Sequence, residues 1–379
     1  MVRLIHTADV HLGRTFKFLG EFGKTLRGQV RKTFERVVSL ARERQAHALL
    51  IPGDLFDSLR PDPGDLRFAL ETIASVNPLP VFLLPGTHDR YAPNSVYRRL
   101  TPDERPRNLY LFDPDHRTFY LADLGLAVHG RANEVSKGGA PPLTGIAPHP
   151  EARFNVALAH ASIALPHLTE DPEHDYFVSE AEVRASGVQY LALGHWHKCA
   201  EYYLGNSFRV WYAGSPETLQ FEDGDASSYV LEVILRDGAV DVRRERIGRY
   251  TWTERDLDVS GIPDRQAFER ELLQLVGEDQ IVRVNLKGTR SATAAVDLTA
   301  IEEAVNPQFA YFELRTQGLR TRWEDFDPTT VFPHGTVGAA FVTLAKERLA
   351  QASEGERTHW EEVLRRGTAL LAGQEEVSG

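Results

Sequence analysis

The chain has 379 residues, enough for two or three domains at about 150 residues each. Hydrophobic residues make up 42% of the sequence and charged residues 26%, which is usual for a soluble globular protein. The single cysteine, Cys199, excludes an intrachain disulfide and a cysteine-rich zinc site. The net charge of −11 argues against a general attraction to nucleic acid, but it does not exclude a local basic groove.

The sequence predicts neither a signal peptide nor a membrane segment. The amino-terminal residues reach Asp9 before an apolar signal region has formed. No apolar run approaches the roughly 20 residues that cross a bilayer. We therefore expect a cytoplasmic protein with no membrane contact.

The first half of the chain alternates short apolar runs with helical patterns. This alternation predicts βαβ units and a largely parallel or mixed sheet. The predicted strands are 3–8, 48–51, 81–84, 109–112, 126–129, 154–159 and 190–193, and the predicted helices are 28–45 and 66–74. After residue 197 the pattern becomes antiparallel, with strands at 200–204, 209–212, 229–235 and 240–246 and turns at 205–206 and 237–238.

A second unit is predicted from about residue 248, where a compact α+β pattern begins. Its expected order is strand 251–259, helix 265–276, strand 280–286, helix 298–304 and strand 309–316. Two further helices, 337–352 and 357–372, follow it. We therefore expect a domain at 1–247, a small α+β cap at 248–320 and a helical tail at 321–379.

Five short segments rich in carboxylates and imidazoles follow predicted strands. They lie at the carboxyl ends of these strands, where open α/β sheets place their ligand sites. Carboxylates and imidazoles without a thiolate suit manganese, iron or zinc. The segments are Asp9-Val10-His11, Gly53-Asp54, Gly86-Thr87-His88-Asp89, His160-Ala161 and Gly194-His195-Trp196-His197.

The spacing within these segments favours a shared site. In extended backbone, residues two apart point to the same side, so both members of an Asp-x-His or His-x-His pair reach one site. The glycines let the backbone turn where a strand ends. Singly, each segment is a weak signal: a Gly-Asp pair is usually a turn, and a buried histidine such as His129 is usually a hydrogen-bonded core residue. The ordered set predicts a binuclear metal site, in which two ions about 3.5–4 Å apart clamp a phosphoryl group.

In this order, the five segments resemble the signature blocks of the calcineurin-like metallophosphoesterases. Three stretches, 6–13 (HTADVHLG), 52–57 (PGDLFD) and 212–217 (YAGSPE), resemble the DNA-repair nuclease branch, the SbcD-type and YhaO-type exonuclease subunits. The resemblance covers about residues 1–247. It implies an α/β (α+β) fold, a four-layer αββα sandwich of two mixed sheets, with a small α+β cap domain and a C-terminal helical tail.

The resemblance also implies the ligands of two divalent metal ions, which are usually manganese in this branch. One carboxylate, Asp54, is expected to bridge the two ions. The implied ligands are Asp9, His11, Asp54 and His197 for one metal, and Asp54, His160 and His195 for the other.

The third segment carries the implied catalytic residues and one departure from the family pattern. His88 is expected to act near the leaving group as a general acid or charge stabiliser, oriented by Asp89. The family has an asparagine, a ligand of the second metal, where this chain has Thr87. Since a hydroxyl is a poorer ligand than an amide oxygen, we expect a weaker second site.

Basic and aromatic residues follow the first and third segments. We expect Arg14, Lys17 and Arg90 to contact phosphates without base readout, although such residues are also common as solvated loop charges. The neighbouring basic residues are Lys24, Arg27, Arg98 and Arg99. The aromatic residues, which either stack on splayed bases or pack the loop down, are Phe16, Phe18, Phe22 and Tyr91.

The apolar side chains of the two terminal helices allow two interpretations. They pack on their own domain, or, as the family branch implies, they grip the coiled coil of an SbcC-type SMC-like ABC ATPase. A homodimer is a further expectation from the family.

We predict a manganese-dependent DNA phosphodiesterase, an exonuclease or endonuclease of double-strand-break repair that works with this ATPase. Two alternatives stay open, because fold does not fix substrate. One is a phosphodiesterase or phosphatase for a small nucleotide, and the other is a weakly catalytic DNA-binding subunit of a repair complex.

Overall fold

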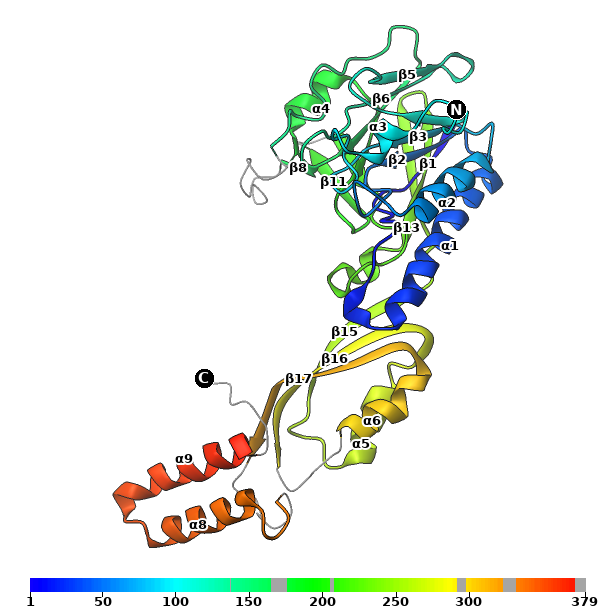
Figure 1. The fold of residues 1–379 in the computed structure, drawn as a ribbon. Coiled ribbons are helices and arrows are strands. Elements are labelled where there is room, and N and C mark those ends of the chain that lie inside the picture. Colours follow the sequence, from blue (N-terminus) through cyan, green and yellow to red (C-terminus); the bar gives the residue numbers. More distant parts are fainter. Residues whose placement is uncertain (137, 165–175, 205–207, 292–297, 323–331, 372–379) are drawn as a thin grey trace. The chain divides into compact units, whose positions relative to one another are not determined.

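Two six-stranded mixed sheets make up most of the amino-terminal part of the computed structural model (Figure 1). The structure describes residues 1–136, 138–164, 176–204, 208–291, 298–322 and 332–371, so the predicted turn at 205–206 lies outside the described residues. The chain divides into two compact units, Met1–Thr253 with Asp279–Ile281 and Glu254–Glu278 with Val282–Gly379. The predicted domain boundaries at 247 and 320 stay a prediction.

The first sheet has the strand order β14-β13-β1-β2-β3-β4. Strands β1 to β4 run parallel, whereas β13 is antiparallel to both β1 and β14. Their bounds are β1 Val2–His6, β2 Ala48–Pro52, β3 Val81–Leu84, β4 Leu109–Leu111, β13 Tyr229–Arg236 and β14 Ala239–Arg246.

The second sheet has the order β11-β12-β10-β7-β6-β5. Strands β6, β7, β10 and β12 are parallel neighbours, and the edge strands β5 and β11 pair antiparallel. The edge strand β5 was not predicted, because its sequence, Thr-Phe-Tyr-Leu, is only four residues long. The bounds are β5 Thr118–Leu121, β6 Leu126–Gly130, β7 Phe154–His160, β10 Tyr190–Gly194, β11 Ala200–Leu204 and β12 Phe208–Tyr212.

The two sheets pack face to face through one apolar core. Leu4, Leu50 and Phe82 of the first sheet and Val156 and Leu158 of the second belong to the same buried cluster. Alternate residues of the strands face outward, where helices cover them. Helix α1 (Phe22–Glu43) contacts β2, and α4 (Glu180–Ser186) packs on the outer face of β7 and β10. The predicted fold of two mixed sheets between helices is confirmed.

Helix α1 begins at Phe22, six residues before the predicted start at Gly28. Three glycines between residues 20 and 28 indicate a loop in the sequence. In the structure Gly23 lies inside the helix, where a Cβ atom would stand 2.5 Å from the carbonyl oxygen of Phe16. This glycine therefore serves a close backbone contact rather than a turn.

Two buried histidines are structural. His6, at the end of β1, joins the two sheets, because its Nδ1 lies 2.8 Å from Tyr190 Oη and its Nε2 lies 3.1 Å from the Leu193 carbonyl. Burial lowers the pKa of His6 to about 3, so the ring is neutral. His129 contacts Thr118 and Asn155 and is a hydrogen-bonded core residue, as expected.

The second unit contains most of a three-stranded sheet, ordered β15-β16-β17, and helices that pack on it. Phe268 and Leu272 of α5 and Ile301 of α6 share a buried cluster with Val282 and Val284 of β16. Helices α8 and α9 contact each other, and Phe341 lies against Gly367. The bounds are β15 Thr251–Asp258, α5 Arg265–Leu273, β16 Gly277–Ser291, α6 Leu298–Val305, β17 Phe309–Arg322, α8 Val337–Gln351 and α9 Glu354–Leu371.

Several short elements complete the described part of the chain. No described helix combines the length and the apolar character that a membrane span requires. The remaining elements are η1 Lys17–Leu19, α2 Pro63–Ala74, α3 Val96–Arg99, η2 Ala122–Leu124, β8 Ser162–Ile163, β9 Phe177–Val178, η3 Phe221–Ala226 and η4 Asn306–Gln308.

Candidate metal centre

The five predicted segments meet where parallel strands of both sheets end. Asp9 and His11 follow β1, Asp54 follows β2, and residues 86–89 follow β3. His160 is the last residue of β7, and His195 and His197 follow β10. The carboxyl ends of parallel neighbours share one sheet edge, so these loops converge as expected.

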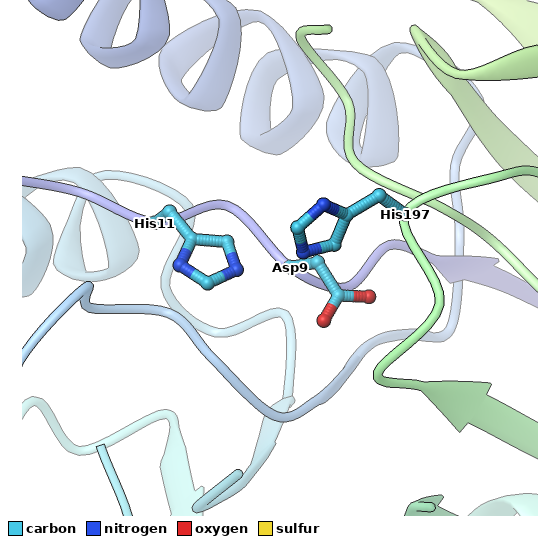
Figure 2. A group of neighbouring side chains, drawn as sticks. All are labelled: Asp9, His11 and His197. Atoms are coloured by element: carbon cyan, nitrogen blue, oxygen red, sulfur yellow. The ribbon is translucent and has the colours of Figure 1, made fainter. Parts of the chain in front are cut away.

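Three groups of potential ligands are found among the described residues, and within each group the ligand atoms lie within 4.8 Å of one another. His11, Asp57 and His88 form one of them, and the other two share Asp9. Of these two, the first consists of Asp9, His11 and His197, whose side chains point toward a common space (Figure 2). The second consists of Asp9, Asp54 and His160. The ring of His195 lies 5.2 Å from that of His160, centroid to centroid, so all seven residues with the predicted ligand role surround one small volume, Thr87 included.

The backbone of these segments differs from the expectation. Asp9, His11 and Asp54 have φ near 52° and His195 has φ of 103°, so all four residues lie in the left-handed region rather than in extended backbone. The expected alignment of residues two apart along an extended chain is therefore wrong. Instead, the loops after β1 and β2 run side by side, where Asp9 N donates to Gly53 O and His11 N donates to Asp54 O. Such residues cost about 1–3 kcal/mol each and are held by the surrounding structure.

Two glycines are required by the close approach of ligand side chains. Gly53 has φ of +98°, and a Cβ atom there would lie 2.0 Å from His160 Nδ1. At Gly86 a Cβ atom would lie 2.3 Å from Asp54 Oδ1. The glycines therefore make room for ligands as well as for turns.

Asp54 belongs to the second group and also lies close to His11 of the first. Its Oδ1 accepts the backbone N–H groups of Thr87 and His88, each at 2.8 Å. Its Oδ2 lies 3.2 Å from His160 Nε2 and 3.8 Å from His11 Nε2. Burial would raise the pKa of Asp54, but His160 and then His11 outweigh burial and hold the pKa below its usual range. Asp54 is thus an ionised carboxylate whose Oδ2 lies near one histidine of each group.

Asp9 and His160 are also fully buried and have fixed partners. Both carboxylate oxygens of Asp9 accept from His195 N, at 3.0 and 3.1 Å. His160 Nδ1 lies 3.0 Å from the Pro52 carbonyl, which leaves Nε2 toward Asp54. Burial would lower the pKa of His160, but Asp54 and Asp9 raise it to about 9.

His11 has the environment of a metal ligand. Its Nδ1 lies 2.9 Å from Asp57 Oδ1, so the proton on this nitrogen is donated to a carboxylate. Its Nε2 is buried and has no hydrogen-bond partner among the described residues. Metal-binding histidines are usually oriented by a carboxylate in this way, with the other nitrogen directed at the ion. The orphaned nitrogen and the adjacent carboxylates therefore fit a divalent cation.

His197 is oriented in a similar way by a second carboxylate. Its Nδ1 lies 3.4 Å from Asp223 Oδ2, and its ring centroid is 5.1 Å from that of His11. Burial would lower the pKa of His197, but Asp223 and Asp9 raise it above its ordinary value.

Neither Asp57 nor Asp223 was predicted as a site residue. Asp57 closes the conspicuous stretch 52–57, which is a usable signal. Asp223 lies in an acidic turn far from the other segments and gives none.

The structure corrects the role expected for Asp89. This carboxylate is fully buried and accepts from Gly86 N, Phe56 N and Tyr97 Oη, at 2.8, 3.1 and 2.6 Å. Burial, followed by the charge of Asp54, raises the pKa of Asp89 to about 6. With both oxygens so engaged, Asp89 shapes the loop after β3 and does not orient the ring of His88.

The ring of His88 lies beside Asp57 and His11 instead. His88 Nδ1 is 3.8 Å from Asp57 Oδ1, and its ring centroid is 4.8 Å from that of His11. Nearly half of its side chain, 48%, is exposed. His88 is therefore the accessible imidazole of the cluster.

The hydroxyl of Thr87 lies among the donors of the second group. Its Oγ1 is 3.3 Å from Asp54 Oδ2 and 3.3 Å from His160 Nε2. A threonine side chain thus occupies the position at which the family has an asparagine.

The predicted phosphate contacts lie at different distances from the cluster. Arg14 Nη1 is 3.9 Å from Asp57 Oδ1, and Arg90 donates to the Thr87 carbonyl at 3.2 Å. Lys17 is exposed on η1. Lys24 and Arg27 form ion pairs with Glu21 and Asp65, and Arg98 lies over the ring of Tyr91.

The aromatic residues of the first loop pack it down. Phe16 is buried, and Phe22 and Phe18 contact Tyr250 and Trp252 respectively.

The order and geometry of these donors agree with the comparison of the sequence with known families. Residues 2–199 match the family model described as calcineurin-like phosphoesterase. The chain belongs to this family. Because members of the family use divalent metals, the predicted metal-dependent phosphoesterase is confirmed at this level.

Curated relatives of this phosphoesterase include archaeal and bacterial proteins. The chain is 28% identical over 333 residues to the DNA double-strand break repair protein Mre11 of Methanopyrus kandleri, covering 79% of this chain and 68% of that protein. It is 27% identical over 318 residues to Mre11 of Haloferax volcanii, covering 80% and 66%. A 91-residue stretch is 29% identical to a subunit of the nuclease SbcCD of Staphylococcus saprophyticus, covering 23% of each chain. This chain thus spans about two thirds of the length of the first two relatives.

The contact between Asp57 and His11 predicts a loss of metal affinity. Asp57→Ala should weaken the binding of one divalent ion by roughly 10–100-fold, because His11 loses the carboxylate that orients its ring. Isothermal titration with Mn²⁺ measures this affinity. Asp123→Ala, which removes an exposed carboxylate from η2, is the control and should bind Mn²⁺ like the wild type. Equal affinities for the two variants would contradict the role of Asp57.

Proposed function

We propose that this phosphoesterase is a DNA phosphodiesterase of double-strand-break repair that works in the cytoplasm with an SMC-like ATPase. The observation that carries the proposal is the cluster itself, in which two carboxylates and two histidines lie around His11, whose Nε2 has no hydrogen-bond partner among the described residues. The names of the relatives, which are repair proteins and a nuclease subunit, support DNA as the substrate.

The cluster suits two divalent ions, which we propose to be manganese. When bound, such a pair polarises a phosphodiester and supplies a hydroxide nucleophile near neutral pH. The buried carboxylates contribute negative charge, and the imidazoles are already oriented by hydrogen bonds. The proposed ligands are Asp9, His11, Asp54 and His197 for one ion, and Asp54, His160 and His195 for the other, with Thr87 beside the second.

His88 is the residue proposed to assist the leaving group. Its backbone N–H is held by Asp54 Oδ1 at 2.8 Å, which fixes the residue beside the bridging carboxylate. Its ring is half-exposed, and its Nδ1 lies 3.8 Å from Asp57 Oδ1. From this position the imidazole donates a proton to the departing alkoxide or stabilises its charge. Arg14, Lys17 and Arg90 are proposed to contact the phosphates of the strand.

The direct test is cleavage of DNA with Mn²⁺. The protein should degrade linear DNA, and His88→Ala should reduce the rate by roughly 10²–10⁴-fold with its metal content unchanged, the range for lost acid–base assistance. His116→Ala, which alters an exposed histidine paired with Asp113, is the control and should cleave at the rate of the wild type.

Other outcomes of this assay would favour the alternative functions. Linear, hairpin and circular DNA are compared with a small synthetic phosphodiester. Cleavage of the small diester without any cleavage of DNA favours a nucleotide phosphodiesterase. DNA binding without cleavage of either substrate favours a weakly catalytic subunit. Loss of metal in His88→Ala would make His88 a ligand instead.

Thr87 predicts a weak second metal site. Its hydroxyl is shorter and less negatively charged than the amide oxygen of asparagine, so the protein should bind a second Mn²⁺ less tightly than the first. Thr87→Asn should tighten this site and raise the rate at limiting Mn²⁺, whereas Thr87→Val, which removes the hydroxyl, should weaken it further. A calorimetric count of bound Mn²⁺ measures all three proteins. Two equally tight sites that neither substitution changes would contradict this prediction.

The carboxyl-terminal helices are proposed to dock on the ATPase. Val337 and Leu344 of α8 and Leu370 of α9 are exposed, at 78%, 55% and 69%, although they are large apolar residues. Exposed apolar residues of this size on two adjacent helices are typical of an interaction surface. The expected homodimer stays a prediction.

Substitution of these residues tests the docking surface. The pair Leu344→Glu and Leu370→Glu should abolish co-purification with an SMC-like ATPase from the same organism, because two carboxylates would be desolvated in the interface. Leu273→Glu, on the exposed side of α5 at 41% exposure, is the matched control and should bind normally. Unchanged binding of the double variant would exclude these residues from the interface.

A further inference from the structure

The motif at residues 212–217 contributes no ligand to the proposed metal site. It lies against the backbone of His197. Ser215 N donates to the His197 carbonyl at 2.9 Å. At Gly214, whose φ is +70°, a Cβ atom would lie 2.5 Å from the same carbonyl oxygen. This motif therefore supports the main chain of a proposed metal ligand.

The same motif holds the segment 247–250 near the end of the first unit. Ser228 N donates to Ser215 O at 2.8 Å, and Ser228 O accepts from Ile247 N at 2.8 Å. The carboxylate of Glu217 accepts the backbone N–H groups of Arg249 and Tyr250, both at 3.1 Å. It also accepts the Thr33 hydroxyl at 2.6 Å, so this buried carboxylate joins α1 to the segment.

A second series of contacts leads from this segment to the ring of His197. The indole of Trp252 is buried and stacks edge-to-face on Phe221, with 4.8 Å between ring centroids. Its N–H has no hydrogen-bond partner among the described residues, so ring packing determines where it lies. Phe221 begins η3, and Asp223 of the same element lies 3.4 Å from His197 Nδ1.

The Asp223 carboxylate has one oxygen left for His197. Its Oδ1 accepts from Gln220 Nε2 at 3.2 Å. Its Oδ2 is buried and has no hydrogen-bond partner in the described part of the chain, and His197 Nδ1 lies 3.4 Å from it. A buried charged acceptor without a partner is unfavourable, so a contact with His197 Nδ1–H is favoured. Cys199 N also donates to Ala226 O at 2.6 Å, which fixes the other end of η3 beside His197.

We propose that Asp223 is a positioning residue for His197, and that Trp252 sets the position of Asp223 through Phe221. The affinity for one metal would then depend on the segment 247–252, from which the chain continues into the second unit at Glu254. The inference rests on the proposed metal site and adds to it the side chains that position one of its ligands.

A double-mutant cycle tests the proposal by metal affinity rather than by cleavage. Asp223→Ala should weaken one of the two bound Mn²⁺ ions by roughly 10–100-fold, because His197 loses the partner of its Nδ1. Trp252→Ala should weaken the same ion by a smaller factor. The double variant should bind Mn²⁺ no more weakly than Asp223→Ala alone, since Trp252 acts through Asp223. Isothermal titration of the full chain measures all the affinities.

Two further variants separate positioning from folding. Trp252→Phe keeps an aromatic ring against Phe221 and should restore most of the Mn²⁺ affinity. Phe18→Ala is the matched control: Phe18 contacts the same indole, with 6.3 Å between ring centroids, but does not lead to η3. It should bind Mn²⁺ like the wild type.

Several results would overturn the proposal. They are additive losses in the double variant, a wild-type affinity for Asp223→Ala, or an equal loss in Phe18→Ala. If Trp252→Ala does not fold, two comparisons of Mn²⁺ affinity replace it. Trp252→Phe is compared with the wild type, and the variant with both Trp252→Phe and Asp223→Ala is compared with Asp223→Ala alone. If the Mn²⁺ affinities show that Trp252 acts through Asp223 but the protein does not cleave DNA, only the proposed substrate is contradicted.

Discussion

The structure around the candidate metal centre depends on the burial of two carboxylates, Asp9 and Asp54, within one small volume. A buried charge is strongly unfavourable unless donors surround it. Here backbone N–H groups supply these donors: Thr87 and His88 donate to Asp54, and His195 donates to Asp9. Each donor belongs to a loop that follows a different strand from the carboxylate that it serves. The need to solvate two charges therefore determines how these loops are placed relative to one another.

The unusual backbone of these loops follows from the same constraint. To direct N–H groups at a carboxylate and side chains at a common centre, the chain must turn within one or two residues. Asp9, His11 and Asp54 accordingly adopt left-handed conformations, and Gly53 and Gly86 leave room for His160 and Asp54. Such conformations persist only where packing holds them. The shared core of the two sheets provides that packing, with Leu4, Leu50 and Val156 fully buried in it.

The sequence predicted most of the strands and the convergence of the five segments. Apolar runs identify strands from local patterns, and one topological rule places the ends of parallel strands together. It did not predict side-chain direction. Asp89 follows His88 directly but turns to Tyr97, and Asp57 rather than Asp89 lies beside His88. The direction of each side chain depends on partners that only folding brings close. Their separations along the sequence follow no rule of local residue spacing. The start of α1 was missed for a similar reason, since Gly23 serves a contact with the Phe16 carbonyl that exists only in the folded chain.

The two histidines of the first ligand group are supported differently. His11 is held by Asp57 at 2.9 Å, and the two loops that carry them are joined by backbone hydrogen bonds, so this side of the site is preorganised. His197 is held by Asp223 at 3.4 Å, from an element that packs on Trp252. The support of His197 therefore comes from a separate element, η3, whereas that of His11 comes from the loops that carry the other proposed ligands. Under the proposal above, this asymmetry makes substitutions in η3, or at the tryptophan beside it, affect His197 and leave His11 unchanged.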